Sequence, residues 1–297
     1  MNLPISLHIF KNILNKGEDL ERSTTILDGE DCHHREPEIT RRRRSGREKV
    51  IIVAKARFDE NIAAHYDETS VRMYQPEVLD PAVDFLEELT GDGAALEFGI
   101  GTGRVALPLS GRGVAVHGID ISEPMLEQLR RKPGAEQIAV TVGDFARTRV
   151  DGTFRLAYLV FNTITNLTTQ DGQVECFKNA AAHLESGGYF VIEVFVPELR
   201  RVPPGERVRA FEVGRTHLGF DEYTDFVRQI LYSHHYWIDD GGSRTFSAPY
   251  RYVWPAELDL MARLAGLTLR ERWAGWTREP FTDDSTSHVS VWEKVGK

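Results

Sequence analysis

The chain has 297 residues, 41% of them hydrophobic, and carries a formal net charge of −9 with an isoelectric point near 5.6. This length and composition can bury a full core, and they favour one α/β domain with an added segment over two equal domains. The acidic balance argues against a large phosphate-binding surface, so we expect a small or medium-sized molecule as partner and no nucleic acid.

Cysteine content and hydropathy narrow the class of protein further. The only cysteines are Cys32 and Cys176, which indicates neither a disulfide framework nor a cysteine metal site. No apolar run is long enough to span a membrane, so we expect no membrane partner. Together these features predict a cytoplasmic enzyme.

Residues 1–55 differ from the rest and are predicted to form a disordered or loosely ordered extension. Residues 1–16 have helical character but lack the shape of a signal peptide. The four arginines at 41–44 could touch an anionic surface, yet the acids on both sides favour a solvated linker. Residues 32–34 read Cys-His-His, but adjacent side chains rarely converge on one metal ion and no partner pair is in view.

Ordered structure is predicted to begin near residue 56. Residues 56–67 place apolar side chains at helical spacing, and 78–89 form a second helix that leads into an apolar strand at 94–98. Glycines follow that strand at 99, 101 and 103. They permit positive φ angles and close approach of a ligand to the backbone, ahead of a helix that opens at Val105. A dinucleotide site would need a further glycine where Arg104 stands.

Acids end the next two predicted strands. Residues 114–120 form a buried strand that closes on Asp120, whose carboxylate is placed to accept from both hydroxyls of a ribose. Ser122 then caps a helix with a proline in its first turn. A third strand at 138–142 precedes Asp144. Either acid alone could be an ordinary loop residue, but their order after the glycine turn points to a nucleotide-type ligand.

The sequence from residue 156 onward predicts the remaining strands of the sheet. Residues 156–161 form a fourth strand, and a helix at 170–184 ends at Ser-Gly-Gly 186–188 before a fifth strand at 189–194. Residues 255–265 form a helix, and strands at 267–273 and 288–293 complete the sheet.

An insertion at 202–253 has a different spacing of apolar residues. Residues 207–213, 225–232 and 245–253 alternate with period two, and Asp-Asp-Gly-Gly at 239–242 is a hairpin turn, which together predict an antiparallel sheet. Its surplus of aromatic residues could shape a ligand pocket, form a homodimer interface or fill the insertion's own core.

This order of elements, over residues 56–294, resembles the class I S-adenosylmethionine (SAM)-dependent methyltransferases. The layout is similar to that of the small-molecule enzymes which methylate the amino group of deoxysugars. The resemblance implies a doubly wound, seven-stranded Rossmann-like α/β sheet with an N-terminal helical cap and an antiparallel β insertion that serves as a lid. It also implies SAM as the cofactor and methyl transfer to a small-molecule acceptor.

The resemblance carries a set of cofactor-binding residues with it. Asp144 would accept from the adenine amino group, Met125 would pack on adenine unless it is only a core residue, and Tyr66 would close on the methionine end unless it merely packs. Glu97 would serve the cationic methionine end directly or through the loop. The implied set is Tyr66, Glu97, Gly99, Gly101, Gly103, Asp120, Ile121, Met125, Asp144, Phe145, Phe161 and Asn162, with 162–166 at the methyl-transfer centre.

Methyl transfer from a sulfonium is an in-line displacement that depends on placement and needs no metal. An oxygen or carbon acceptor would need a base, for which His65, His234 and His235 are candidates. The aspartate-asparagine arrangement of magnesium-dependent catechol O-methyltransferases is not recognisable. Two alternatives stay open: an NAD(P)-dependent oxidoreductase, disfavoured by Arg104 and the lack of a Tyr-Lys pair, and a SAM-binding protein without catalysis.

Overall fold

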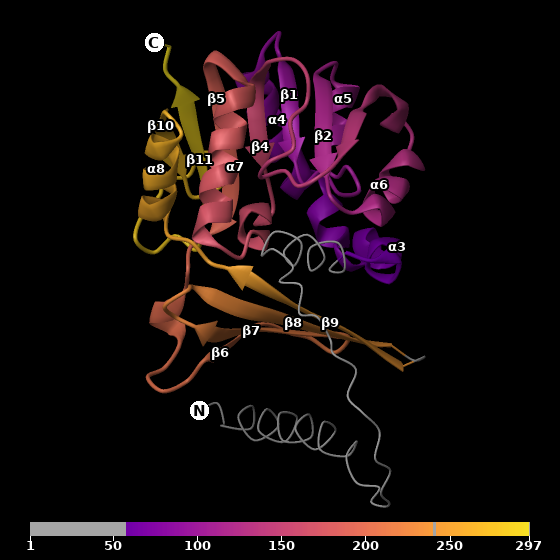
Figure 1. Cartoon of the computed structure of the whole chain (residues 1–297). Helices are drawn as coiled ribbons and strands as arrows, with labels where there is room; N and C mark the ends of the chain where they lie inside the picture. Colours follow the sequence, from indigo (N-terminus) through magenta and orange to yellow (C-terminus); the bar gives the residue numbers. More distant parts are fainter. Residues whose placement is uncertain (1–57, 240–241, 297) are drawn as a thin grey trace, which may run out of the picture. The chain divides into compact units, whose positions relative to one another are not determined.

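The computed structural model describes residues 58–239 and 242–296, and its centre is a seven-stranded sheet (Figure 1). The spatial order of the strands is β10-β11-β5-β4-β1-β2-β3. The five strands from β3 to β5 pair in parallel, whereas β11 runs antiparallel to both β5 and β10. The bounds are β1 Ala94–Phe98, β2 Ala115–Asp120, β3 Ala139–Val142, β4 Phe154–Leu159, β5 Leu184–Phe195, β10 Leu267–Trp273 and β11 Ser287–Lys294.

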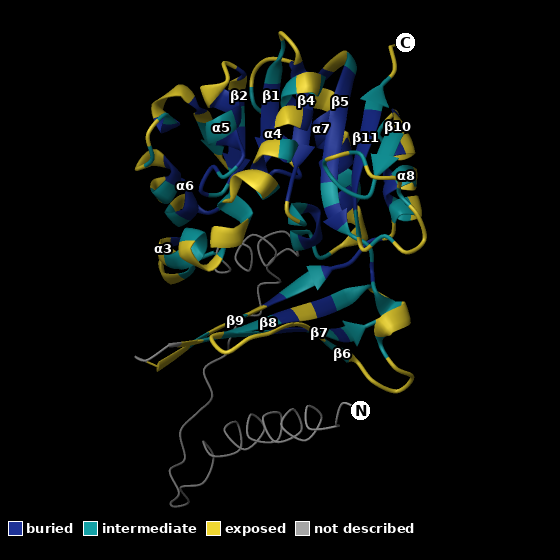
Figure 2. Cartoon of the chain, turned by 180° about the vertical axis from the view of Figure 1, so that it is seen from behind, coloured by how far each residue is buried: buried dark blue, intermediate teal, exposed yellow. Residues whose placement is uncertain are grey.

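Helices cover both faces of this sheet, which confirms the predicted doubly wound α/β fold. Successive strand residues point to opposite faces, so Leu96 joins the core under α7 and α8 while Ala95 joins the core under α4, α5 and α6. In Figure 2 the central strands β1, β4, β5 and β11 are buried along most of their length, whereas the edge strand β10 is largely not. The helices are α3 Glu60–Thr69, α4 Pro76–Thr90, α5 Ala106–Gly111, α6 Glu123–Arg130, α7 Gln170–His183 and α8 Pro255–Leu264.

Helix starts follow the local sequence. The side chain of Ser122 caps α6 as predicted, accepting from the amide nitrogen of Met125 at 3.3 Å. Asp59 caps α3 through the amide of Ile62 at 3.0 Å. These caps fix where the helices that border the carboxyl ends of β1 and β2 begin.

A second sheet, formed within the predicted insertion, is antiparallel as expected. Its order is β6-β7-β8-β9, with bounds β6 Val208–Val213, β7 His217–Asp225, β8 Ile230–Asp239 and β9 Gly242–Arg251. The predicted strand at 225–232 is wrong, because a tight turn at 226–229 separates β7 from β8. Asp225 Oδ1 accepts from the amides of Val227 at 3.0 Å and Arg228 at 2.8 Å, and this side-chain turn reverses the chain. The predicted hairpin at 239–242 includes residues 240–241, which lie outside the described part.

Two other boundaries differ from the prediction. β4 ends at Leu159, so Phe161 lies in the following turn rather than in the strand. The Ser-Gly-Gly run at 186–188 does not end the helix: α7 stops at His183, and the run lies inside β5 at a register shift against β4. Gly187 takes a φ of +77°, which explains why glycine serves an irregular strand here as well as it would a helix end.

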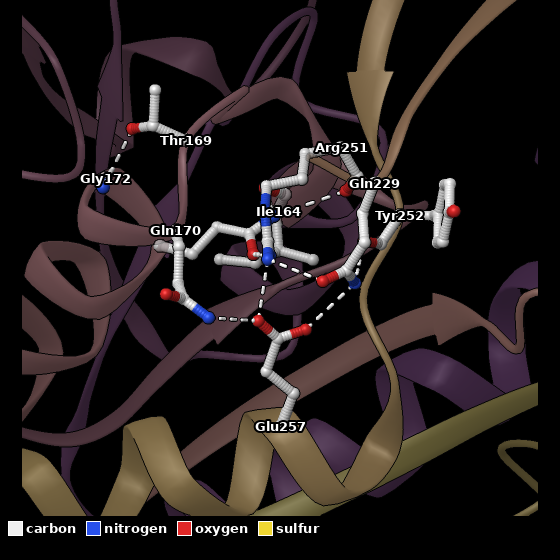
Figure 3. Close-up of polar contacts among 9 residues, drawn as sticks. Ile164, Thr169, Gln170, Gly172, Gln229, Arg251, Tyr252 and Glu257 are labelled. Carbon is white, nitrogen blue, oxygen red and sulfur yellow. Dashed lines mark hydrogen bonds and ion pairs between the residues drawn. The ribbon is translucent and has the colours of Figure 1, made fainter. Parts of the chain in front are cut away.

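The second sheet is anchored to the first by a buried polar junction around Arg251 (Figure 3). This guanidinium bonds Gln173 Oε1 of α7 at 2.5 Å, Gln229 Oε1 at 2.9 Å and Glu257 Oε1 of α8 at 2.6 Å. Burial alone would raise the pKa of Glu257, but its hydrogen bonds, above all from Arg251, hold that pKa below the usual value. The junction thus fixes where β9 leaves the second sheet for α8.

The predictions for residues 1–55, including the arginine run and the Cys-His-His sequence, lie outside the described residues. Among residues 58–239 and 242–296, no helix is both long and apolar enough to cross a bilayer.

Candidate active site

A cavity of about 1120 Å³ lies where the carboxyl ends of the parallel strands face α3 and the second sheet. Its wall includes Gly99 after β1, Asp120 at the end of β2, Phe161 after β4 and Phe195 at the end of β5. Open α/β sheets bind ligands at this edge because every parallel strand ends there. Of the predicted cofactor residues, the wall contains Tyr66, Gly99, Gly101, Asp120, Ile121, Met125, Asp144, Phe145, Phe161 and Asn162.

Glycine is required in the loop after β1 for reasons that differ along the loop. Gly99 and Gly101 have φ angles of +72° and +55°. A Cβ on Gly99 would lie 2.6 Å from Thr163 Cγ2 and would intrude on the cavity edge. Gly103 is not on the cavity wall, and a Cβ there would lie 2.4 Å from Leu129 Cδ1 of α6. The third glycine therefore allows close helix packing, whereas the first two border the ligand space.

Asp120 connects the glycine loop to the start of α6. Its Oδ2 accepts from the amide of Gly101 and its Oδ1 from the amide of Ser122, both at 2.8 Å. Burial raises the pKa of Asp120, and the backbone hydrogen bonds oppose that rise. Each carboxylate oxygen has a further lone pair, so the group can still accept from ligand hydroxyls in the cavity.

The wall beside Asp120 is apolar and continues to the loop after β3. Met125 is 4% exposed and Phe145 is 9% exposed, and Phe145 stacks on Phe98 with ring centroids 6.0 Å apart. Asp144 is fixed by accepting from the amide of Ala146 at 2.9 Å. An apolar slot with a carboxylate at each end suits an adenosine group, which has a flat ring, an amino donor and two ribose hydroxyls.

Glu97 lies beneath the glycine loop and off the cavity wall. It is 2% exposed, and its Oε2 accepts from the Tyr158 hydroxyl at 2.9 Å. Burial raises the pKa of Glu97 to about 8, so the carboxyl is protonated at neutral pH. Between the two roles that the sequence leaves open, this position favours action through the loop.

Asp67 links α3 to the glycine loop, a role that the sequence did not single out. Its Oδ1 accepts from the hydroxyls of Tyr74 and of Thr102, the latter at 2.7 Å, and its Oδ2 lies 2.5 Å from Lys132 Nζ. Lys132 also donates to the Thr102 carbonyl at 2.8 Å. The neighbouring Tyr66 is held on the cavity wall by this attachment. The sequence gives little signal for this role, because the partners lie 7 to 65 positions from Asp67 in the chain.

The turn after β4 is strained and well supported. Phe161 and Asn162 have consecutive positive φ angles of +53° and +63°, which cost energy in residues other than glycine. The Phe161 amide donates to Glu193 Oε2 at 2.8 Å, and Asn162 Oδ1 accepts from the Phe195 amide at 2.8 Å. These bonds from β5 hold the Phe161 and Asn162 backbone against the cavity.

The three histidines proposed as bases fall in different places. His65 lines the cavity with its Nδ1 2.9 Å from the Asn61 carbonyl oxygen. His235 also lines it, and burial, with smaller effects of neighbouring histidines, lowers its pKa to about 4. His234 is not on the wall and lies 2.8 Å through Nδ1 from Ser247 Oγ. Adjacent residues of β8 point to opposite faces, so only one of this pair can face the cavity.

Fold and cavity together define an α/β protein that binds a nucleotide-type cofactor at the strand ends and has room for a second molecule beneath a second sheet. Comparison with known proteins gives the particular family. A family model described as a methyltransferase domain matches residues 95–188. The structure of the CcbJ methyltransferase from Streptomyces caelestis is 37% identical with a TM-score of 0.67, covering 73% of this chain and 89% of that one.

Two further relatives extend the comparison. A cypemycin N-terminal methyltransferase from a Streptomyces species is 26% identical over 240 residues, covering 77% of this chain and 97% of that protein. The SAM-bound structure of CalS10, an amino pentose methyltransferase from Micromonospora echinaspora, has a TM-score of 0.59 at 23% identity, covering 77% of this chain and 96% of that one. The chain belongs to the class I SAM-dependent methyltransferases of small molecules. Nothing in the comparisons favours an oxidoreductase or a non-catalytic SAM-binding protein.

Proposed function

We propose that this methyltransferase methylates an amine nitrogen of its small-molecule acceptor. The observation that carries the proposal is one continuous cavity. One end of it has the residues implied for SAM, and the other end is the inner face of the second sheet. That inner face carries aromatic rings together with the acid Asp221, and Glu198 of the segment before β6 also lines the cavity. Two relatives, named for an N-terminus and for an amino pentose, also support an amine acceptor.

The cofactor-binding roles are part of this proposal. Asp120 would hold the ribose hydroxyls, Met125, Ile121 and Phe145 the adenine ring, and Asp144 the adenine amino group. Tyr66 would cover the methionine end, and the turn at Phe161 and Asn162 would border the methyl group. Gly99 and Gly101 would let the cofactor lie on the backbone, while Glu97 and Gly103 would support the loop. We also propose residues 56–294 as the catalytic domain, with 202–253 as its lid.

The chemistry then follows from placement. Bound SAM supplies an electrophilic methyl group whose bond to sulfur breaks as the new bond to nitrogen forms, with the electron pair passing to sulfur. A neutral amine has its own lone pair for this attack, so the protein needs no strong base, which agrees with the low pKa of His235. The protein's contribution is to align the acceptor nitrogen on the axis of the breaking bond and to exclude water.

A panel assay tests the acceptor class. The protein is incubated with SAM and with amino sugars and short peptides that have free amino termini, each beside its hydroxyl or N-acetyl counterpart. We expect mass increases of one methyl group on amines alone, with equal release of S-adenosylhomocysteine. Methylation of the hydroxyl counterparts would contradict the amine assignment. The Asp120→Ala variant serves as the inactive control.

Cellular location and assembly are separate proposals. The charged composition and the low cysteine count support action in the cytoplasm. A homodimer would place the exposed aromatic rings of the second sheet, such as Phe226, in an interface. Light scattering of the purified protein, which returns 33.7 kDa for a monomer or twice that for a dimer, tests the assembly.

A further inference from the structure

The two faces of the second sheet differ in what they carry. The cavity is lined by alternate residues of β7, His217, Asp221 and Tyr223, which lie directly opposite Trp237, Ser233 and Leu231 of β8. His235 also lines it, opposite Gly219. Among these residues the acid is Asp221, which lies directly opposite Ser233. The neighbours Glu222 and His234 are absent from the cavity wall. The strand alternation therefore presents one carboxylate, Asp221, from the centre of β7 to the acceptor end of the cavity.

The positive charge opposite Asp221 is shared with a second acid. Arg209 of β6 is the direct cross-strand partner of Asp221 and lowers its pKa, but the guanidinium forms its ion pair with Glu198. Among residues 58–239 and 242–296, no lysine or arginine forms an ion pair with Asp221. Its hydrogen-bond partner is the hydroxyl of Ser233, which is 8% exposed. Burial raises the pKa of Asp221 to about 6, which leaves it mostly ionised at pH 7 but incompletely compensated.

The surroundings of this carboxylate are aromatic. Toward one end of the sheet, the rings of His217, His235 and Trp237 stack against one another, with centroids 5.2 to 5.3 Å apart in each pair. The ring of Phe211 lies 5.1 Å from that of His235. Gly219 makes this possible, because a Cβ there would lie 2.1 Å from Phe211 Cε2. Toward the other end, Tyr223 packs with Leu231. Aromatic rings around one carboxylate are suited to an organic cation.

A series of contacts links the strands around Asp221 to the turn that borders the proposed methyl-transfer centre. Its neighbouring pair, Tyr223 and Leu231, forms a small core against which Phe195 packs. The Phe195 amide in turn bonds the Asn162 side chain at 2.8 Å. A short path of direct contacts therefore joins the Asp221 pair to the turn after β4.

We propose that Asp221 selects the acceptor by binding its amine as an ammonium ion, with Ser233 holding the carboxylate in position. This inference rests on the proposed amine methylation and adds a residue to it. Asp221 attracts the charged form and orients the nitrogen toward the cofactor end. The ammonium then gives one proton to solvent water, and the lone pair of the resulting neutral amine attacks the methyl carbon. A neutral alcohol of the same shape would leave the carboxylate without a cation.

Binding to the enzyme saturated with S-adenosylhomocysteine tests this directly. The ligands are phenethylamine and 2-phenylethanol, which share a ring that the aromatic wall can hold and differ mainly in their charge. We expect calorimetry on the wild type to show binding of the amine about 10-fold or more tighter than the alcohol. Asp221→Asn, which keeps the shape of the side chain, should remove that preference.

Glu222→Gln is the matched control, because it removes a charge from the adjacent residue of the same strand, on the other face. It should keep the preference for the amine. A wild type without preference, or an Asp221→Asn variant that retains it, would overturn the proposal. Binding of S-adenosylhomocysteine by each variant, within about 2-fold of the wild type, verifies that the site is folded.

Steady-state kinetics separate this inference from the amine proposal. With an amine methylated in the panel assay, Asp221→Asn should raise KM for the amine about 10-fold or more and change kcat much less. If the amine is methylated with an unchanged KM, Asp221 has no selecting role although the function stands. If only alcohols are methylated, the proposed function itself is wrong.

Discussion

The cofactor end and the acceptor end of the cavity are built in different ways. At the cofactor end, Asp120 is the last residue of β2 and Asp144 lies just after β3, and backbone amides hold both carboxylates. At the acceptor end, the wall is one face of an antiparallel sheet, and its polar groups bond side chains of other strands, as Asp221 does with Ser233. Local geometry therefore fixes the first site, whereas sheet pairing fixes the second.

This difference explains how one fold can keep its cofactor while its acceptor changes. The cofactor residues are tied to the core strands, where a shift would disturb β1 and β2 as well. The acceptor residues lie on a separate sheet, which is joined to the core by the Arg251 junction and by the packing of Phe195 on Tyr223 and Leu231. Substitutions on the inner face of that sheet can alter specificity without touching the glycine loop.

The largest effect is expected from removing the Arg251 junction, which tests whether the two ends of the cavity behave separately. Arg251 is 3% exposed, and in Arg251→Met three polar side chains lose their buried cation. We expect the free energy of unfolding to fall by about 3–5 kcal/mol, as when one partner of a buried ion pair is removed. Denaturant unfolding measures the loss. At 25 °C the folded variant should still bind SAM within about 3-fold of the wild type, because the cofactor end is built by the core.

Arg228→Met is the control, since that side chain is 84% exposed on the turn between β7 and β8. Its unfolding free energy should change by less than about 0.5 kcal/mol. A loss of SAM affinity in Arg251→Met as large as the loss of acceptor binding would show that the two ends do not behave separately.

The cofactor end is tested next by Asp120→Ala. The variant loses the acceptor of two backbone amides and, by our proposal, of the ribose hydroxyls. We expect SAM to bind on the order of 100-fold more weakly, from hydrogen bonds to a charged group worth about 1.5–3 kcal/mol each. Calorimetry with S-adenosylhomocysteine provides the measurement. Glu127→Ala, on the exposed side of α6, should bind normally, and an affinity retained by Asp120→Ala would refute the ribose role.

The smallest effect is expected where α3 attaches to the glycine loop. Asp67→Asn keeps the size of the side chain but removes the charge that faces Lys132. Because this attachment positions Tyr66 rather than contacting the cofactor, SAM affinity should fall by only about 3- to 10-fold. The exposed neighbour Glu68 supplies the control as Glu68→Gln, which should match the wild type.

The effect of Asp67→Asn on stability should depend on pH. Burial alone would raise the pKa of Asp67, but hydrogen bonds from Lys132, Tyr74 and Thr102 hold it below its usual value. The ionised form therefore stabilises the fold above the unfolded pKa of about 3.9, and this contribution is lost as the pH falls further. The melting temperature of the wild type should exceed that of Asp67→Asn at pH 7, and the difference should shrink as the pH falls below about 3.9. A constant difference would mean that the charge of Asp67 is unimportant.

Much of the cofactor end could be predicted because its signals are local. The three glycines, Asp120 and Asp144 follow apolar strands in the chain, and parallel strands must bring their carboxyl ends to one edge. The distinction between Gly103, which packs against Leu129, and the other two glycines needed the tertiary structure. So did the partners of Asp67, because they come from separate elements.

The sequence by itself determined the order of helices and strands and the glycine loop, since periodicity, caps and glycine positions act over a few residues. The cofactor class came from its resemblance to a known family. Only the tertiary structure decided the acceptor end. Period-two alternation continues through the turn at 226–229, so it reveals neither where β7 ends nor which of His234 and His235 faces inward. That choice depends on which face of the second sheet covers the strand ends. The Arg251 junction fixes that face through hydrogen bonds between residues 22 to 78 positions apart in the chain.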